Sequence, residues 1–261
     1  MIRGVWSRGT VGWVIAAALL PTLAVLLVQE GLDAALRVSV ALAVVAAWQL
    51  VFRVAAGMPM SPTALVSAVA IGVLAPGDLA LWQWVLAVSF GTVLGEMVFG
   101  GWGRNFVSGA VVTLAFVFIS FPDVAHEPAG PVVALACVPA AAMLLATGIL
   151  SWRVLASAVT ALTATALLLG VDAAALPGLG GVAFGLVFLL GDPVASPSTP
   201  AGRLLYGALG GALTAILGQG LGGIGAPQAV VFAALLASIF APLIDHAVVA
   251  YWAYRRRSLH G

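Results

Sequence analysis

The chain has 261 residues, of which 63% are hydrophobic and only 7% are charged, and its mean hydropathy is +1.18. A soluble domain carries about 25% charged residues, so this composition cannot cover a surface that faces water. It predicts an all-α integral membrane protein with several spans. The net charge of +1 leaves too little basic charge for a nucleic-acid-binding face.

Ten apolar segments follow one another along the chain, and each predicts a helix that crosses the membrane. They cover residues 10–28, 34–52, 62–76, 79–99, 105–121, 131–150, 152–170, 178–191, 203–220 and 227–253. A crossing helix needs about 20 residues, so the third and the eighth are short. The first is longer than the core of a signal peptide and has no small-x-small cleavage site, so we expect it to be a span.

The charged residues predict the orientation. With ten spans and the N-terminus inside, nine of the ten arginines fall on the inner side, and only Arg37 falls outside. This is the bias that the positive-inside rule describes. The acids expected on the outer side are Glu30, Asp33, Asp78, Asp123, Glu127 and Asp172. We therefore predict a bacterial inner-membrane protein with both termini in the cytoplasm.

A glycine-rich turn occurs twice. Gly100-Gly101-Trp102-Gly103 is echoed by Gly222-Gly223-Ile224-Gly225, and both copies lead into Ala-Val-Val and then, at equal spacing, a phenylalanine. Five spans precede the loop at 122–130 and five follow it, so the second set would enter the membrane in the opposite direction. We predict a single membrane domain built from two inverted five-helix repeats, residues 1–122 and 131–261. Such repeats place a site near the midplane between them.

The first copy of the turn is a candidate site. Glu96 precedes it, and Arg104 and Asn105 follow its glycines. A Glu–Arg pair at a membrane boundary could anchor the turn through a charge-assisted hydrogen bond. It could equally hold a polar ligand, because glycines let backbone N–H groups approach closely. Both interpretations stay open.

Two further acidic positions are candidates for ion binding or coupling. Residues 191–200 place Asp192 and three hydroxyl side chains, including Ser196, among three prolines. This acceptor-rich segment could coordinate a cation or cap the next helix. Asp245 lies in the last span, where an ionisable group indicates function, although it could instead pair with the arginines at 255–257.

Other chemistries are not expected. The three histidines, His126, His246 and His260, are not placed for bis-histidine haem ligation. The single cysteine, Cys137, excludes an internal disulfide and a thiolate metal site. There is no cluster of metal ligands and no serine–histidine–acid arrangement, so we predict neither a metal centre nor covalent catalysis.

Several segments carry a family resemblance. They are Gly95-Glu96-Met97-Val98-Phe99-Gly100-Gly101-Trp102-Gly103-Arg104-Asn105-Phe106, Gly191-Asp192-Pro193-Val194, Leu205-Tyr206-Gly207 and Phe240-Ala241-Pro242-Leu243-Ile244-Asp245-His246. In this order they resemble the NqrB/RnfD/RnfE family, the membrane subunits of redox-driven complexes that move sodium ions or protons. The resemblance implies ten spans in two inverted five-helix repeats. It also implies other subunits as partners, including a flavin or iron–sulfur reductase.

The resemblance also implies a flavin. A non-covalent riboflavin or FMN would lie near the glycine turn, where the family's Asn-x-x-Asn maps onto Asn105 and Ser108. The family attaches a second FMN to a threonine in the outer loop after span five. Residues 122–130 contain no threonine, and Thr163-Ala164-Thr165 imitates the motif only inside span seven. We therefore expect no covalent FMN.

Three functions follow as hypotheses. The first is an electron-transfer subunit of an ion-translocating oxidoreductase, which uses its own flavin or a partner's. The second is a small-solute transporter or channel on the same scaffold. The third is a membrane anchor for a soluble reductase.

Overall fold

The computed structural model describes residues 7–124, 129–171 and 179–260. All regular structure in these ranges is helical, which confirms the all-α prediction. Arg3, His126, Glu127 and Asp172 lie outside the described residues, as does the start of the eighth apolar segment.

Each of the ten apolar segments contains a described helix. Those before the loop at 122–130 are α1 (Arg8–Ala18), α2 (Leu20–Ala56), α3 (Thr63–Leu74), α4 (Leu81–Thr92) with the π-helical turn η1 (Val93–Met97), and α5 (Gly109–Ser120). Those after it are α6 (Pro131–Ala146), α7 (Trp152–Leu168), α8 (Gly180–Phe184) with the π-helical turn η3 (Gly185–Leu189), α9 (Pro200–Gly220) and α10 (Pro227–His260). In the described part of the chain, three helical stretches are long and apolar enough to cross a membrane: Arg8–Ala56, Pro200–Gly220 and Pro227–Arg256.

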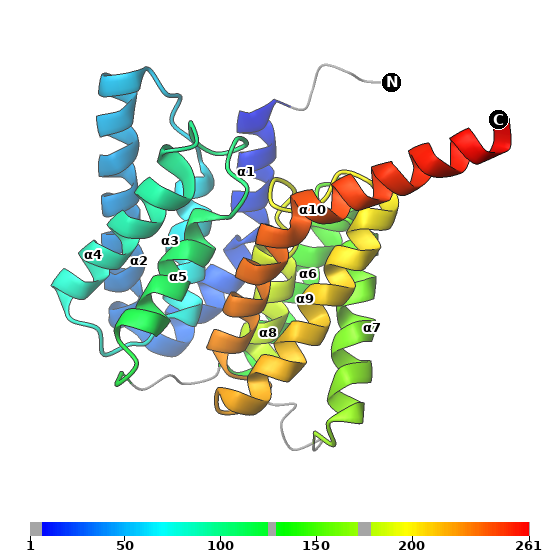
Figure 1. Ribbon diagram of the computed structural model, residues 1–261. Helices are drawn as coiled ribbons and strands as arrows, with labels where there is room; N and C mark the ends of the chain where they lie inside the picture. The colour runs from blue at the N-terminus through cyan, green and yellow to red at the C-terminus, as the bar shows by residue number, and fades with distance from the viewer. Residues whose placement is uncertain (1–6, 125–128, 172–178, 261) are drawn as a thin grey trace.

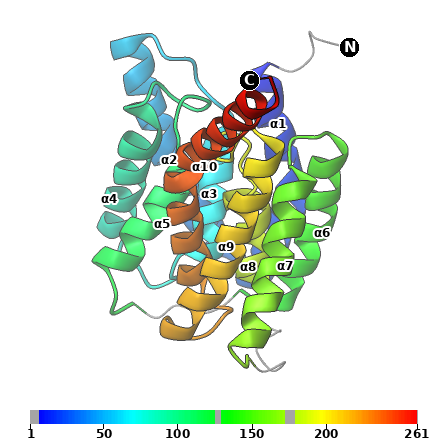
Figure 2. The same ribbon diagram turned by 45° about the vertical axis from the view of Figure 1, so that its right-hand side comes forward.

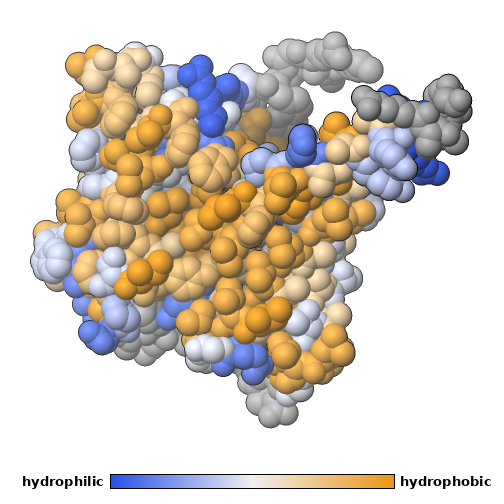
Figure 3. Space-filling model, in the orientation of Figure 1, coloured by the Kyte–Doolittle hydropathy of each residue, from blue (hydrophilic) through white to orange (hydrophobic). Residues whose placement is uncertain are grey.

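The helices form one bundle in which the chain runs alternately up and down (Figures 1 and 2). Helix α1 begins and helix α10 ends at the same end of the bundle, the top of Figure 1. Helix α10 continues past the bundle there and projects to one side. The outer face between the two ends is apolar, and polar groups gather at the ends (Figure 3). This distribution suits a surface covered by lipid.

Glycines let neighbouring helices approach each other closely. A Cβ atom at Gly211 of α9 would overlap the backbone carbonyl of Ala158 on α7, and one at Gly91 of α4 would overlap Thr113 on α5. Small residues at such crossings are the usual means of packing helices in a membrane, where the hydrophobic effect does not drive helix association.

Helix α2 is interrupted at Gly31, whose backbone angles of φ 60° and ψ −128° are not helical. The break separates residues 20–30 from the longer arm that ends at Ala56. The first predicted span therefore consists of α1 and the first arm of α2, which meet at Leu19.

The two glycine turns have the same backbone structure. Gly100 and Gly101 have φ of 98° and 87°, and Gly222 and Gly223 have φ of 95° and 115°. In the first turn the N–H of Gly101 donates to the carbonyl of Glu96 at 3.0 Å. In the second turn the N–H of Gly223 donates to the carbonyl of Gly218 at 2.8 Å. The first turn lies at the top of Figure 1 and the second at the bottom.

Candidate functional site

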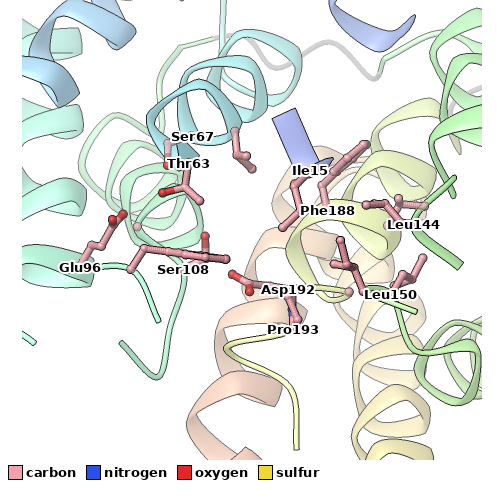
Figure 4. A pocket seen from close by; sticks show the side chains of 16 residues that line it. Ile15, Thr63, Ser67, Glu96, Ser108, Leu144, Leu150, Phe188, Asp192 and Pro193 are labelled. Atoms are coloured by element: carbon pink, nitrogen blue, oxygen red, sulfur yellow. The ribbon is translucent and has the colours of Figure 1, made fainter. Parts of the chain in front are cut away.

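A small cavity lies beside the first glycine turn, between helices from the two parts of the chain (Figure 4). Its lining comprises Ile15, Thr63, Val66, Ser67, Glu96, Trp102, Ser108, Gly109, Leu144, Ile149, Leu150, Val187, Phe188, Gly191, Asp192 and Pro193. The cavity volume is about 30 Å³. One water molecule needs about 10–15 Å³, so the cavity has room for two water molecules or a small cation.

Glu96 enters the cavity from η1. Its side chain is only 3% exposed, and the N–H of Trp102 donates to its carboxylate. The other oxygen, Oε1, is buried and has no hydrogen-bond partner among the described residues. The π-helical turn that carries Glu96 is closed by a bond from Val98 N–H to the carbonyl of Val93 at 2.9 Å. Such turns insert one residue into a helix and are frequent at functional sites.

Asp192 enters from the opposite side, on the loop that follows η3 (Figure 4). Its side chain is 9% exposed, and its Oδ1 accepts a hydrogen bond from the N–H of Val194 at 2.8 Å. Asp192 lies close enough to Glu96 for the two charges to interact. The fold therefore brings together two buried carboxylates that are far apart in the sequence.

Hydroxyl groups and helix ends complete the lining. Thr63 and Ser67 come from the first turns of α3, and Ser108 is the N-cap of α5. The N-termini of both helices thus face the cavity, and their partial positive charge favours nearby carboxylates. Sequence reasoning missed Thr63 and Ser67, because hydroxyl side chains at the start of a short helix are also ordinary capping residues.

The lining offers oxygen ligands only. Carboxylate and hydroxyl oxygens suit hard cations rather than soft metals. Within the described ranges, no group of three or more histidine, cysteine, aspartate or glutamate side chains could hold a metal ion. Two carboxylates with surrounding hydroxyls therefore fit a proton or a single small cation better than a transition metal.

The predicted flavin-binding residues have other roles in this structure. Asn105 is 4% exposed; its Oδ1 accepts from the N–H of Gly103 at 3.0 Å, and its Nδ2 donates to the carbonyl of Val107 at 2.7 Å. Its amide therefore holds the turn together. Arg104 is exposed and lies along Gly100, and no ion pair joins it to Glu96 among the described side chains. Of the six residues predicted to bind the cofactor, only Ser108 lines the cavity.

The cavity does not fit a flavin. Pockets for ligands of that size have volumes of about 300–1,000 Å³, whereas this one has about 30 Å³. The glycines of the turn do not line it. A flavin at the glycine turn therefore has no matching space between the described residues.

Asp245 and Ser196 lie outside the cavity lining but act on the loop that carries Asp192. Asp245, on α10, accepts four hydrogen bonds from Ser198 and Thr199, two from backbone N–H groups and two from hydroxyls. Thr199 also caps α9 by accepting from the N–H of Gly202 at 3.1 Å. The N–H of Ser196 donates to the carbonyl of Asp192 at 3.1 Å. The loop is therefore tied to α10, to α9 and to itself.

These features define the class of protein: an apolar helical bundle with an oxygen-lined, doubly acidic site between two sets of helices. Comparison with known proteins then gives the family. The family model described as the NQR2, RnfD, RnfE family matches residues 5–129 and 124–252. The chain belongs to this family, which confirms the resemblance found in the sequence, and the protein is a membrane subunit.

Known relatives share the match at low identity. One subunit of the Na(+)-translocating NADH-quinone reductase of Chromohalobacter salexigens is 29% identical over 76% of this chain and 61% of the relative. The subunit of the same name from Pseudomonas aeruginosa strain PAO1 is 29% identical over 82% of this chain and 66% of the relative. That from Haemophilus influenzae strain PittEE is 27% identical over 81% of this chain and 65% of the relative. The chain thus spans less than two thirds of the length of these relatives.

Proposed function

We propose that this chain is the membrane subunit of an ion-translocating redox complex, and that Glu96 and Asp192 bind Na⁺ or H⁺ during the translocation. One observation carries the proposal. The unpartnered Oε1 of buried Glu96 faces a cavity that a second buried carboxylate also lines. A buried charge is costly unless it is paired. Since no arginine pairs with Glu96 among the described residues, a bound cation or proton supplies the missing charge.

The position of α3 supports movement of the ion along the bundle. Thr63 and Ser67 line the small cavity, and Gly72 and Val73 of the same helix line a second hollow toward the other end. Ser67 and Gly72 are separated by about 7.5 Å at 1.5 Å per residue. The packing between them is apolar and includes fully buried Val69. A cation leaving the site would have only this short barrier to cross.

The proposal includes the predicted topology: ten crossings, two inverted five-helix repeats at 1–122 and 131–261, and cytoplasmic termini in a bacterial inner membrane. The matching glycine turns at opposite ends of the bundle support an inverted arrangement. The common end at which α1 begins and α10 ends supports an even number of crossings. The two family matches also meet at residues 124–129, close to the proposed boundary.

The relatives are subunits of an NADH-quinone reductase, so we propose that other subunits, including a flavin or iron–sulfur reductase, carry electrons past this one. Because the glycine turn does not fit a flavin, no electron-transfer step is assigned to it. The alternative is a small-solute transporter or channel on the same scaffold, which the cavity between the two sets of helices also suits.

The test uses the assembled complex in liposomes, with Na⁺ uptake and quinone reduction measured together. Glu96→Gln and Asp192→Asn should each reduce Na⁺ uptake at least tenfold, whereas Asp123→Asn, an exposed acid outside the cavity, should not. Unchanged Na⁺ uptake in both cavity variants would remove the site from the mechanism. Solute flux through the isolated chain without any electron donor would favour the alternative.

A further inference from the structure

A polar hollow lies at the end of the bundle opposite the small cavity. It is formed by α2, the end of α3 and the loop that leads into α4. Two adjoining cavities of about 370 and 550 Å³ share Glu30, Arg37, Gly77 and Asp78. These volumes lie in the range of about 300–1,000 Å³ that small-molecule sites occupy.

Arg37 is the only cation in the lining of this hollow. Its guanidinium forms an ion pair with Glu30, and its side chain is 15% exposed. The loop at Gly77 packs against it, since a Cβ there would lie 2.9 Å from Nη1. The Nε atom of Arg37 is buried and has no partner among the described residues. One N–H donor therefore remains for an anionic oxygen.

Two carboxylates remain for a cation. Asp78 lies near the charge of Arg37, and Asp33 lines the wider of the two cavities. Both residues are exposed at the rim. After the Glu30–Arg37 pair is formed, the hollow thus presents one free donor and two free acceptor groups side by side.

The rim beside these groups is apolar. Leu36 is 55% exposed and Leu81 is 64% exposed, and both line the wider cavity. Such side chains at the end of a membrane helix face hydrocarbon. A ligand that satisfies the whole surface needs an anionic group, a cationic group and an apolar tail.

We propose that this hollow binds the headgroup of a zwitterionic phospholipid that carries a primary ammonium group. The phosphate accepts the hydrogen bond from Nε of Arg37, and the ammonium group contacts Asp33 and Asp78. The acyl chains run over Leu36 and Leu81. A choline headgroup has no N–H donor for the two carboxylates, and a phosphatidylglycerol headgroup has no cation. The site therefore discriminates by the N–H groups of the ammonium.

Native mass spectrometry of the purified full-length chain tests the proposal. Titration with phosphatidylethanolamine, phosphatidylcholine and phosphatidylglycerol should show about tenfold tighter binding of the first. Asp33→Asn combined with Asp78→Asn should remove this preference. Glu30→Gln combined with Arg37→Gln, which removes the ion pair as a whole, should weaken binding of all three lipids. Asp123→Asn, at the same end but outside the hollow, is the matched control.

Two results would overturn the proposal. One is equal binding of the three lipids by the unaltered chain, a measurement that depends on no variant. The other is a phosphatidylethanolamine preference that survives in the Asp33/Asp78 variant. Soluble phosphoethanolamine is the second probe: displacement of the lipid at millimolar concentration would show a site for the free headgroup and contradict the role of the apolar rim.

Discussion

Thr199 and Asp245 are joined twice: the hydroxyl of Thr199 donates to Oδ1 of Asp245 at 2.5 Å, and its backbone N–H donates to the same oxygen at 3.1 Å. Ser198 bonds the other oxygen in the same two ways, at 2.7 and 2.8 Å. Asp245 thereby fastens helix α10 to the loop on which Asp192 enters the cavity.

Asp245→Asn should destabilise the protein. An asparagine retains one acceptor oxygen but turns an NH₂ group toward donors of Ser198 or Thr199. A hydrogen bond to a charged group contributes about 1.5–3 kcal/mol, so we expect a loss of roughly 2 kcal/mol. For a protein of this size that corresponds to a fall in Tm of about 4–8 °C. Thermal unfolding in detergent measures it, with Asp123→Asn as the control, and equal Tm values for the two variants would contradict the clamp.

Sodium should stabilise the isolated chain. A ligand present at 100 times its Kd and bound only by the folded state adds about 2.7 kcal/mol to the free energy of unfolding. We expect Tm to rise with NaCl more than with choline chloride at the same ionic strength. Glu96→Gln should abolish this difference, because it removes one of the two carboxylates. A sodium-dependent rise that persists in the variant would place the cation elsewhere.

The left-handed glycines of the two turns should not tolerate a side chain. Gly101 and Gly223 have φ of 87° and 115°, and a Cβ at either would meet no atom within 4 Å. The cost of alanine there is therefore backbone strain alone, about 1–2 kcal/mol. Gly220 also has open space around its Cβ position but is helical, so Gly220→Ala should be neutral or stabilising. Comparing Tm values across the three variants separates strain from crowding.

Gly211→Ala should weaken the contact between α7 and α9. Its Cβ would overlap the carbonyl oxygen of Ala158 and lie 2.8 Å from its carbonyl carbon, so the two helices must move apart. Overpacking of this kind costs about 1–3 kcal/mol. Gly9→Ala is the matched control, because a Cβ there would make only an ordinary contact of 3.8 Å with Ser7. Equal stability of the two variants would show that this crossing tolerates separation.

The helical segments followed from the sequence because their signals are local. Apolar runs predict helices whatever their partners are, and glycine pairs predict turns because only glycine adopts a left-handed backbone without strain. Both copies of the glycine turn have the predicted irregular structure, and their hydrogen bonds match. The importance of Glu96 and Asp192 was also predictable, since acidic residues in apolar segments indicate function.

The partners of these residues could not be read in the same way. Arg104 is the cation nearest to Glu96 in sequence, yet the carboxylate that faces Glu96 is Asp192, from the other part of the chain. Asp245 and Asp192 are both predicted ion-coupling residues, but only Asp192 lines the cavity. Helix formation depends on neighbouring residues, whereas these contacts depend on which helices approach closely, and small residues such as Gly91 and Gly211 determine that only after the bundle has packed. The sequence by itself therefore determined the helices, the turns and the family, and the tertiary structure alone decided which acidic groups share one cavity.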